Sequence, residues 1–311
     1  MEDVLVIGGG PAGAACALWS HQLGMKTTLL EKDAAMGGLQ RRSPYTNRWL
    51  PALPGKTGQD VAAQLHSQLS EAGVSHRLGF EAMSIQREAN APGWRVSSAT
   101  ASLQAHYVVI ATGSVPRCSG FTESDRVGIG PGSSMERIAV RGRRVAILGG
   151  GDNAFDQAIF AGSRGAHSVD IYCRNIPRAQ PLLQLEVLPE RVHVGPFEVD
   201  ASRMTVDGVH YDVIGVQYGF EACVPADLRL PLREGYVDVE RSGAVRGHDD
   251  LFAAGEVTNY WHPCVATAFA HGAQVAKSIQ YRHLRAHRMA SPPTDGHTFA
   301  ASAPERAAVA A

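Results

Sequence analysis

Two glycine-rich segments are the parts of this chain whose residue types and spacing most clearly predict chemistry. Gly8–Gly13 (GGGPAG) follows the apolar run Val4–Ile7, and Gly149–Ala154 (GGGDNA) follows Arg144–Leu148. Each segment precedes a stretch with helical character. A strand, a glycine turn and a helix in this order form a dinucleotide-binding fingerprint, because the N-terminus of the helix presents about half a positive charge to a pyrophosphate. The sequence therefore predicts two nucleotide sites.

The first site has the residues that a dinucleotide cradle needs. Gly8 permits the tight turn, Gly10 lets the backbone approach a pyrophosphate, and Gly13 allows the helix predicted over 14–23 to pack against the strand. The next predicted strand, 27–30, is followed by Glu31, whose carboxylate can accept hydrogen bonds from both hydroxyls of an adenosine ribose. The other candidate residues of this site are Pro11, Ala12 and Lys32.

The second site differs at the residue that contacts the ribose. Its second strand, predicted over 168–172, leads into Cys173 and Arg174, with Arg178 one turn later, and no carboxylate ends it. Guanidinium groups pair with a 2'-phosphate, whereas a carboxylate would select the free hydroxyls of NADH, so these residues favour NADPH, with NADH as the alternative. Both arginines could instead be solvated surface charges. The glycine-loop residues of this candidate site are Gly149, Gly151, Asn153 and Ala154, and a helix is predicted over 155–163.

His262 and Cys264 are candidate catalytic residues because they lie at the start of a long helix, predicted from 264 to about 285. A helix N-terminus stabilises a thiolate, and a histidine can donate a proton to a substrate or a cofactor. The alternatives are a small apolar filler for Cys264 and a hydrogen-bonded loop residue for His262.

The bulk composition limits the classes of partner and compartment. The 29 Lys+Arg residues balance 30 Asp+Glu residues and no basic block is present, so nucleic acid is not an expected partner. Five cysteines are scattered singly, which argues against a disulfide framework and a zinc site and favours a reducing, cytoplasmic setting. No apolar run reaches membrane-spanning length, so we expect a soluble protein without a membrane partner.

Three further segments complete the expected order of elements. Residues 107–113 (YVVIATG) and 251–257 (LFAAGEV) are predicted to be buried strands that end in small residues, which let a ligand approach the backbone. Residues 289–311 are rich in Ala, Pro, Ser and Thr, which predicts a mobile tail. The alternative is a docking segment in which His297 and Phe299 cover a cofactor.

Several of these motifs together resemble the FAD-binding signature of the low-molecular-weight thioredoxin reductases. The matching segments are GGGPAG, Glu31, Met36–Gly38, Ala111–Gly113 (ATG) and Ala254–Thr258 (AGEVT), and the likeness extends to about residue 285. The resemblance implies that FAD binds in the first cradle and that the helix beginning at Cys264 faces the pyrimidine edge of the flavin. It also implies a carboxylate at the ribityl chain, here Glu256 where the family usually has Asp, although Glu256 could instead cap the following segment. The further candidate cofactor residues are Gly38, Leu39, Gln40, Ala111, Thr112, Gly113, Gly255, Val265 and Ala266.

The implied fold class is α/β, with two Rossmann-like three-layer domains, the second inserted within the first. The discontinuous FAD domain is expected at 1–116 and 246–288, the NAD(P)H domain at 117–245 and the tail at 289–311. A length of 311 residues agrees with two domains. Members of the resembling family are commonly homodimers, and on that ground alone a homodimer is expected.

The redox dithiol of the resembling reductases is missing. Gly132–Met135 (GSSM) occupies the place of their Cys-x-x-Cys, and dithiol exchange needs both an attacking and a resolving thiol. We therefore expect an FAD-dependent NAD(P)H oxidoreductase with another acceptor, either an electron-carrier protein, as in the similar ferredoxin/flavodoxin-NADP reductases, or a small molecule. Two alternatives are a non-catalytic flavin-binding sensor or partner-binding module, and a flavoenzyme that ferredoxin reduces and whose NADPH site is degenerate.

Overall fold

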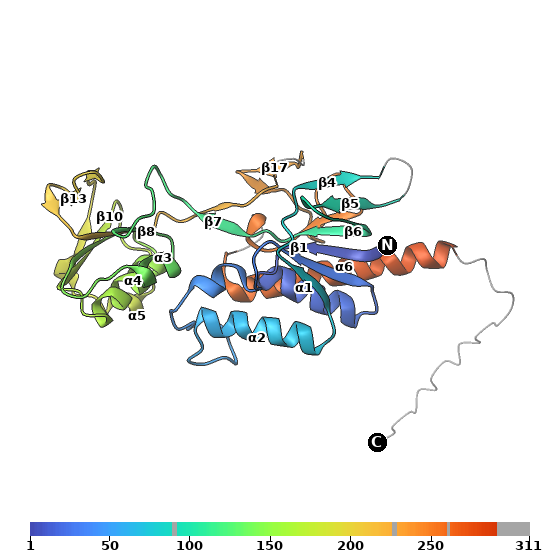
Figure 1. The fold of residues 1–311 in the computed structure, drawn as a ribbon, viewed down its shortest axis with the longest axis horizontal. Helices are drawn as coiled ribbons and strands as arrows, with labels where there is room; N and C mark the ends of the chain where they lie inside the picture. Colours follow the sequence, from blue (N-terminus) through green and yellow to red (C-terminus); the bar gives the residue numbers. More distant parts are fainter. Residues whose placement is uncertain (89–91, 226–228, 260–261, 291–311) are drawn as a thin grey trace, which may run out of the picture.

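The computed structural model describes residues 1–88, 92–225, 229–259 and 262–290. The chain forms two lobes connected by two antiparallel strands, β7 (Ser114–Pro116) on the outward path and β16 (Phe220–Ala222) on the return. Figure 1 shows the second lobe, built from the middle of the chain, standing apart from the lobe that holds the N-terminus and the last helix.

The first lobe contains a seven-stranded sheet in the order β3-β2-β1-β6-β5-β4. The seventh strand, β19, pairs with the C-terminal end of β6, and β5 pairs with its N-terminal end. Strands β1, β2, β3, β6 and β19 run parallel, and β4 and β5 extend the sheet antiparallel. The strands are β1 (Glu2–Ile7), β2 (Thr27–Glu31), β3 (Ser75–Leu78), β4 (Ser84–Arg87), β5 (Trp94–Ser97), β6 (Ser102–Ile110) and β19 (Leu251–Ala253), and the helices are α1 (Pro11–Gln22), η1 (Gly38–Arg42), α2 (Gly58–Glu71), η3 (Gly255–Val257) and α6 (Val265–Ala290).

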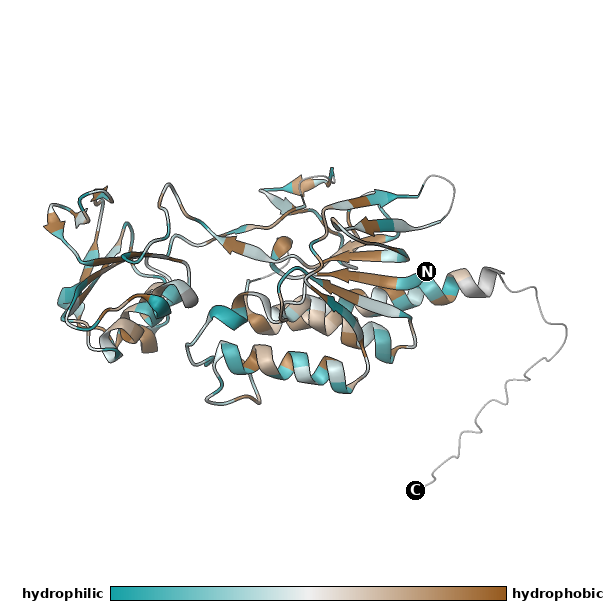
Figure 2. Ribbon diagram, in the orientation of Figure 1, coloured by the Kyte–Doolittle hydropathy of each residue, from teal (hydrophilic) through white to brown (hydrophobic). Residues whose placement is uncertain are grey.

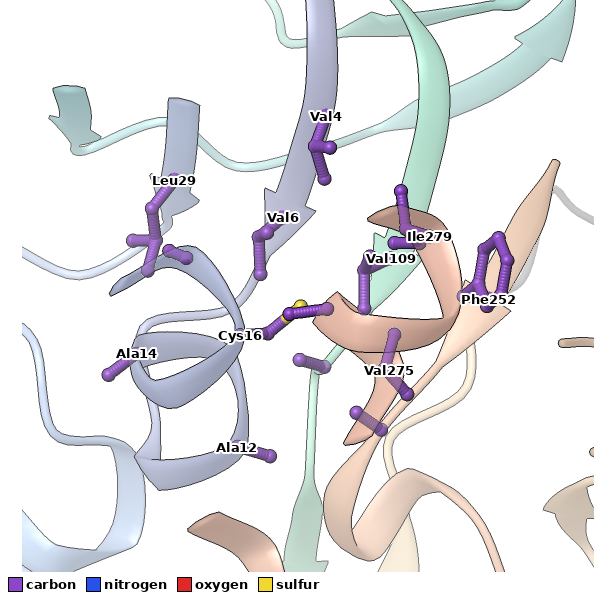
Figure 3. Packing of buried hydrophobic residues seen from close by; sticks show 14 of the residues in the cluster. Val4, Val6, Ala12, Ala14, Cys16, Leu29, Val109, Phe252, Val275 and Ile279 are labelled. Atoms are coloured by element: carbon purple, nitrogen blue, oxygen red, sulfur yellow. The ribbon is translucent and has the colours of Figure 1, made fainter. Parts of the chain in front are cut away.

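Alternate residues of β1 point into two different cores, as the period of a strand requires. Val4 and Val6 pack with α1, α2 and α6, whereas Leu5 and Ile7 pack with the opposite face of the sheet. Figure 3 shows the first of these cores, where small residues such as Ala12 and Cys16 let α1 lie close to α6, and where Val275 and Ile279 of α6 approach Val109 and Phe252.

The second lobe contains a five-stranded parallel sheet in the order β11-β10-β9-β15-β8. The strands are β8 (Val127–Ile129), β9 (Arg144–Leu148), β10 (Ser168–Cys173), β11 (Val192–Val194) and β15 (Val213–Val216), and the helices are α3 (Ser133–Arg137), α4 (Asp152–Ser163), α5 (Pro181–Gln184) and η2 (Pro189–Arg191). Smaller strands of this lobe are β12 (Val199–Asp200), β13 (Thr205–Val206) and β14 (Val209–His210), whereas β17 (Leu232–Arg233) and β18 (Tyr236–Val237) belong to the first lobe. One mixed and one parallel sheet, each with a strand, glycine turn and helix at its centre, confirm the predicted α/β fold class with two Rossmann-like domains.

The return to the first lobe comes earlier in the chain than the predicted boundary at residue 245. Val237 and Val245 are buried in the core of the first lobe, together with Leu5 and Ile7. The chain therefore rejoins the first lobe soon after β16. Alternating apolar residues in 230–245 gave no indication of which core they enter, because both lobes offer an apolar sheet face.

Several predicted elements differ from the structure at their ends. Only Leu251–Ala253 of the predicted strand 251–257 is a strand, because Gly255 has a φ of +79° and turns the chain into η3. Helices α1 and α4 begin directly at the glycine turns, and α6 continues to Ala290. The predicted tail beyond that point, with His297 and Phe299, lies outside the described residues.

The hydropathy of the elements matches this layered arrangement. In Figure 2 the central strands are the most apolar segments, and the helices carry polar residues on part of their surface. Within the described ranges, no helix combines the length and the apolar character needed to cross a bilayer.

Candidate nucleotide and redox sites

The first glycine turn forms an open cradle at the N-terminus of α1. Gly10 is the N-cap residue, and no side chain caps the helix, so its first amides face outward for a ligand. A Cβ added to Gly10 would meet only Gly38 Cα, at 3.9 Å, whereas a Cβ on Gly13 would lie 1.9 Å from the carbonyl oxygen of Gly8. The turn is therefore tight on its inner side and accessible on its outer side, which fits the pyrophosphate of a dinucleotide.

Glu31 is held beside this cradle at the end of β2. Its Oε2 accepts a hydrogen bond from the backbone amide of Gly9 at 2.6 Å, and its Oε1 accepts one from Asp33 at 2.8 Å. The side chain is buried. Two backbone amides thus fix the carboxylate at the edge of the cradle, where the ribose of a bound dinucleotide would lie. Lys32 is exposed next to it, and Leu39 and Gln40 lie half-buried in η1.

The segments after β6 and β19 come together on the same side of the first lobe. A Cβ on Gly8 would lie 2.4 Å from the carbonyl oxygen of Ala111, so the ATG segment packs directly on the cradle. Glu256 accepts a hydrogen bond from the Ser114 hydroxyl at 2.6 Å, and the hydroxyl of Thr112 donates to the carbonyl of Cys223 at 2.6 Å. The structure therefore links Glu256 to β7, a partner that the sequence did not indicate.

His271 is a residue of this region that sequence reasoning missed. The backbone amide of Gly255 donates to His271 Nδ1 at 3.1 Å, which requires the neutral ring. Burial lowers the pKa of His271 to about 4. With Glu256 and His262, it lines a small cavity of about 20 Å³. In the sequence, the signal that could have identified His271 is a polar residue among the apolar positions of the long helix.

Cys264 occupies the N-cap position of α6. Its sulfur accepts a hydrogen bond from the amide of Thr267 at 3.4 Å, and its own amide donates to Thr267 Oγ1 at 3.2 Å. This reciprocal pair has the pattern of a capping box, with Thr267 as a second residue that the sequence analysis did not single out. The carbonyl of His262 accepts from the same hydroxyl at 2.7 Å, and the histidine itself is exposed. Val265 and Ala266 form the first turn of the helix.

The second glycine turn opens into a cavity of about 860 Å³ in the second lobe. All predicted residues of the second site lie at its wall: Gly149, Gly151, Asn153, Ala154, Arg174 and Arg178. Helix α4 begins here with Gly151 as its N-cap and without a side-chain cap. The volume, the uncapped helix and the two exposed guanidinium groups fit a phosphorylated nucleotide.

Aromatic side chains and a third arginine also line this cavity, and sequence reasoning missed them. Phe197 and Tyr218 are both at its wall, and the Arg174 guanidinium carbon lies 5.9 Å from the centre of the Phe197 ring. This contact is a cation–π interaction that limits the positions of the Arg174 side chain. Arg117, which follows β7, reaches the same wall from the connection between the lobes.

The segment Gly132–Met135 packs against the first lobe at Gly132. The Gly132 amide donates to the hydroxyl of Tyr45 at 3.4 Å, and a Cβ on Gly132 would lie 1.3 Å from the carbonyl oxygen of Arg42. Met135 is fully buried. Arg48 and Glu186 add an ion pair of 2.7 Å between the lobes. Gly132 and Met135 therefore make structural contacts in this chain.

Comparison with known proteins relates this chain to a family of pyridine nucleotide oxidoreductases. The sequence pattern of the family described as pyridine nucleotide-disulphide oxidoreductase matches residues 2–187. A ferredoxin-NADP reductase of Limosilactobacillus fermentum is 30% identical over 77% of this chain and 81% of that protein. A ferredoxin-NADP reductase of Levilactobacillus brevis is 26% identical, with 89% and 92% covered. The crystal structure of Lactococcus lactis thioredoxin reductase superimposes on this chain with a TM-score of 0.79 at 20% identity. The superposition covers 92% of this chain and 100% of that one.

Proposed function

Because this chain belongs to the pyridine nucleotide-disulphide oxidoreductase family, as an FAD-dependent NAD(P)H oxidoreductase, we propose that it oxidises NADPH and delivers the electrons to a carrier protein. The observation that carries this proposal is that the sequence contains no Cys-x-x-Cys motif, with Gly132 and Met135 at the place where we expect the dithiol. Without paired thiols, electrons cannot leave through disulfide exchange. The names of two relatives, both ferredoxin-NADP reductases, support a one-electron carrier as the acceptor.

The residues of the first lobe have distinct tasks in this scheme. FAD, when bound, supplies the hydride-accepting and electron-transferring chemistry. The uncapped amides of α1 hold its pyrophosphate, Glu31 its adenosine ribose, and Glu256 its ribityl hydroxyls. The N-terminus of α6 at Cys264 stabilises negative charge at the pyrimidine edge by about 0.3–1 kcal/mol.

The second lobe selects and orients the electron donor. Arg174 and Arg178, at the wall of the cavity, would pair with the 2'-phosphate of NADPH, and the uncapped N-terminus of α4 would bind its pyrophosphate. We further propose that the protein is cytoplasmic and that it works as a homodimer. Light scattering of the purified protein would test the oligomeric state.

Steady-state oxidation of NADPH with a set of acceptors tests the proposal. We expect turnover with ferredoxin or flavodoxin and none with thioredoxin and its disulfide reporter. Turnover with thioredoxin at a comparable rate would contradict the proposed route. Turnover with a quinone alone would replace the carrier protein by a small-molecule acceptor.

A further inference from the structure

The hydroxyl of Ser114 and the carboxylate of Glu256 form a hydrogen bond where the chain leaves the first lobe. Ser114 Oγ donates to Glu256 Oε2 at 2.6 Å, although 142 positions separate the two residues in the sequence. Ser114 is buried and Glu256 is half-buried. No other hydrogen bond to the Glu256 side chain occurs within the described residues, so its second oxygen, Oε1, is left for a ligand.

The backbone around Ser114 is held by the strand that returns from the second lobe. Ser114 is the first residue of β7 and lies opposite Ala222 of β16. The amide of Cys223 donates to the carbonyl of Gly113 at 2.9 Å, and the hydroxyl of Thr112 donates to the carbonyl of Cys223 at 2.6 Å. These contacts fix the main chain on both sides of Ser114, so its hydroxyl is presented from a defined position.

The backbone of Glu256 is fixed separately, but its side chain is not. The Gly255 amide donates to His271 Nδ1 at 3.1 Å, and the Thr258 hydroxyl donates to the Gly255 carbonyl at 2.8 Å. A glutamate has one more rotatable bond than an aspartate, so a fixed main chain still leaves several rotamers for the carboxylate. The hydrogen bond from Ser114 is the contact that selects among these rotamers.

We propose that Ser114 is a positioning residue, which holds the Glu256 carboxylate in the orientation that accepts hydrogen bonds from the ribityl hydroxyls of FAD. This inference rests on the proposed function, because it assumes that Glu256 contacts the ribityl chain. The Ser114 hydroxyl occupies one carboxylate oxygen and orders the side chain before the cofactor binds, so less side-chain freedom is lost on binding. The length of glutamate is part of this arrangement, because an aspartate would withdraw the carboxylate from Ser114 by one methylene.

The first test compares the affinities of the protein for FAD and for ADP, which has the pyrophosphate and adenosine of FAD without the ribityl chain. Dilution of the FAD-loaded protein, followed by flavin fluorescence, gives the dissociation constant of FAD, and competition with FAD gives that of ADP. We expect Ser114→Ala to weaken the binding of FAD about five- to tenfold and to change the binding of ADP less than about twofold. A general loosening of the cradle would instead weaken both ligands.

The control for the loss of a hydroxyl is Ser98→Ala. The half-buried Ser98 donates to the carbonyl of Ala101 at 3.2 Å in the turn between β5 and β6, at the opposite end of β6 from the cradle. This variant should bind FAD and ADP like the wild-type protein. Thermal melting checks that each variant folds. If Ser114→Ala does not fold, Ser114→Cys keeps the size of the side chain with only a weak donor.

A double-mutant cycle with Glu256→Asp identifies the group through which Ser114 acts. In the Glu256→Asp background the carboxylate no longer reaches Ser114, so adding Ser114→Ala should change the affinity for FAD less than about twofold. The same loss in both backgrounds would show that the hydroxyl acts independently of Glu256 and would overturn the inference. Equal losses for FAD and ADP in Ser114→Ala would overturn it as well.

The outcomes separate this inference from the proposed function. If the wild-type protein binds FAD and Ser114→Ala binds it equally tightly, Ser114 does not position Glu256 and the proposed function stands. If the wild-type protein binds no FAD, the proposed function is wrong and the role of Ser114 is overturned with it.

Discussion

The ring of His271 accepts a hydrogen bond from the backbone amide of Gly255, 3.1 Å away, and so ties α6 to the turn that follows β19. This turn carries Glu256, the carboxylate that we place at the ribityl chain. A buried neutral histidine therefore supports the backbone of a cofactor-binding segment, at a position where an ionised ring could not accept the same hydrogen bond.

We predict that stability falls on mild acidification because of His271. Its pKa is about 4 in the folded protein against 6.5 ordinarily. Between these values the unfolded chain binds more protons, so the free energy of unfolding falls as the pH is lowered, by up to about 1.4 kcal/mol per pH unit. Urea unfolding at pH 7 and pH 5, with FAD saturating, measures this. His271→Asn keeps an acceptor for Gly255 without titrating, and an equally steep pH dependence in this variant would exclude His271 as the cause.

We predict that Gly13→Ala destabilises the first lobe. The added methyl would lie 1.9 Å from the carbonyl of Gly8, so β1 and α1 must separate, at a cost of about 2–3 kcal/mol. The readouts are the melting temperature and the amount of FAD retained on purification. Gly162→Ala is the matched control, because this helical position has no atom within 4 Å of an added Cβ and should gain about 0.5–1 kcal/mol. Equal stability of the two variants would contradict the close packing of the cradle.

The two arginines of the second cavity should discriminate between the nucleotides. Arg174→Ala and Arg178→Ala are each expected to weaken the binding of NADPH about tenfold or more, because a charge-assisted hydrogen bond is lost. The binding of NADH should be nearly unchanged. Arg203→Ala, on the exposed surface of the same lobe, should affect neither. Equal losses of affinity for NADPH and NADH in Arg174→Ala and Arg178→Ala would contradict the assignment of these arginines to the 2'-phosphate. Nucleotide titration of the FAD-loaded protein provides the constants.

Restoring cysteines at the two dithiol positions should not create a thioredoxin reductase. In the double variant Gly132→Cys, Met135→Cys, the first side chain would collide with the carbonyl of Arg42, and the second would leave a void in the core. We expect a lower melting temperature and no thioredoxin reduction, whereas Met135→Leu should keep the wild-type melting temperature. Thioredoxin reduction by the double variant would show that the segment can move to reach a partner.

The sequence predicted the two units of strand, glycine turn and helix because each unit is local. A strand, a glycine turn and a helix are contiguous, and Glu31 follows the next strand directly, so residue spacing was enough to indicate them. The roles of these residues stay predictions, while the fold class and the family are confirmed.

Contacts between distant segments could not be predicted in the same way. Ser114 meets Glu256 where β7 leaves the first lobe, and Gly132 meets Tyr45 where the second lobe contacts the first, and neither pair has a spacing that reveals it. The return of Val237 and Val245 to the first lobe was missed for the same reason. Apolar periodicity identifies a buried face, but it does not identify which core receives it.

Anaerobic stopped-flow mixing of the purified protein with NADPH tests most directly whether the first cradle holds FAD and the second its reductant. We predict a yellow protein whose flavin absorbance bleaches rapidly and to completion, faster with NADPH than with NADH. A protein that is colourless and does not take up FAD, or a flavin band that millimolar NADPH leaves unchanged, would contradict the proposed electron path.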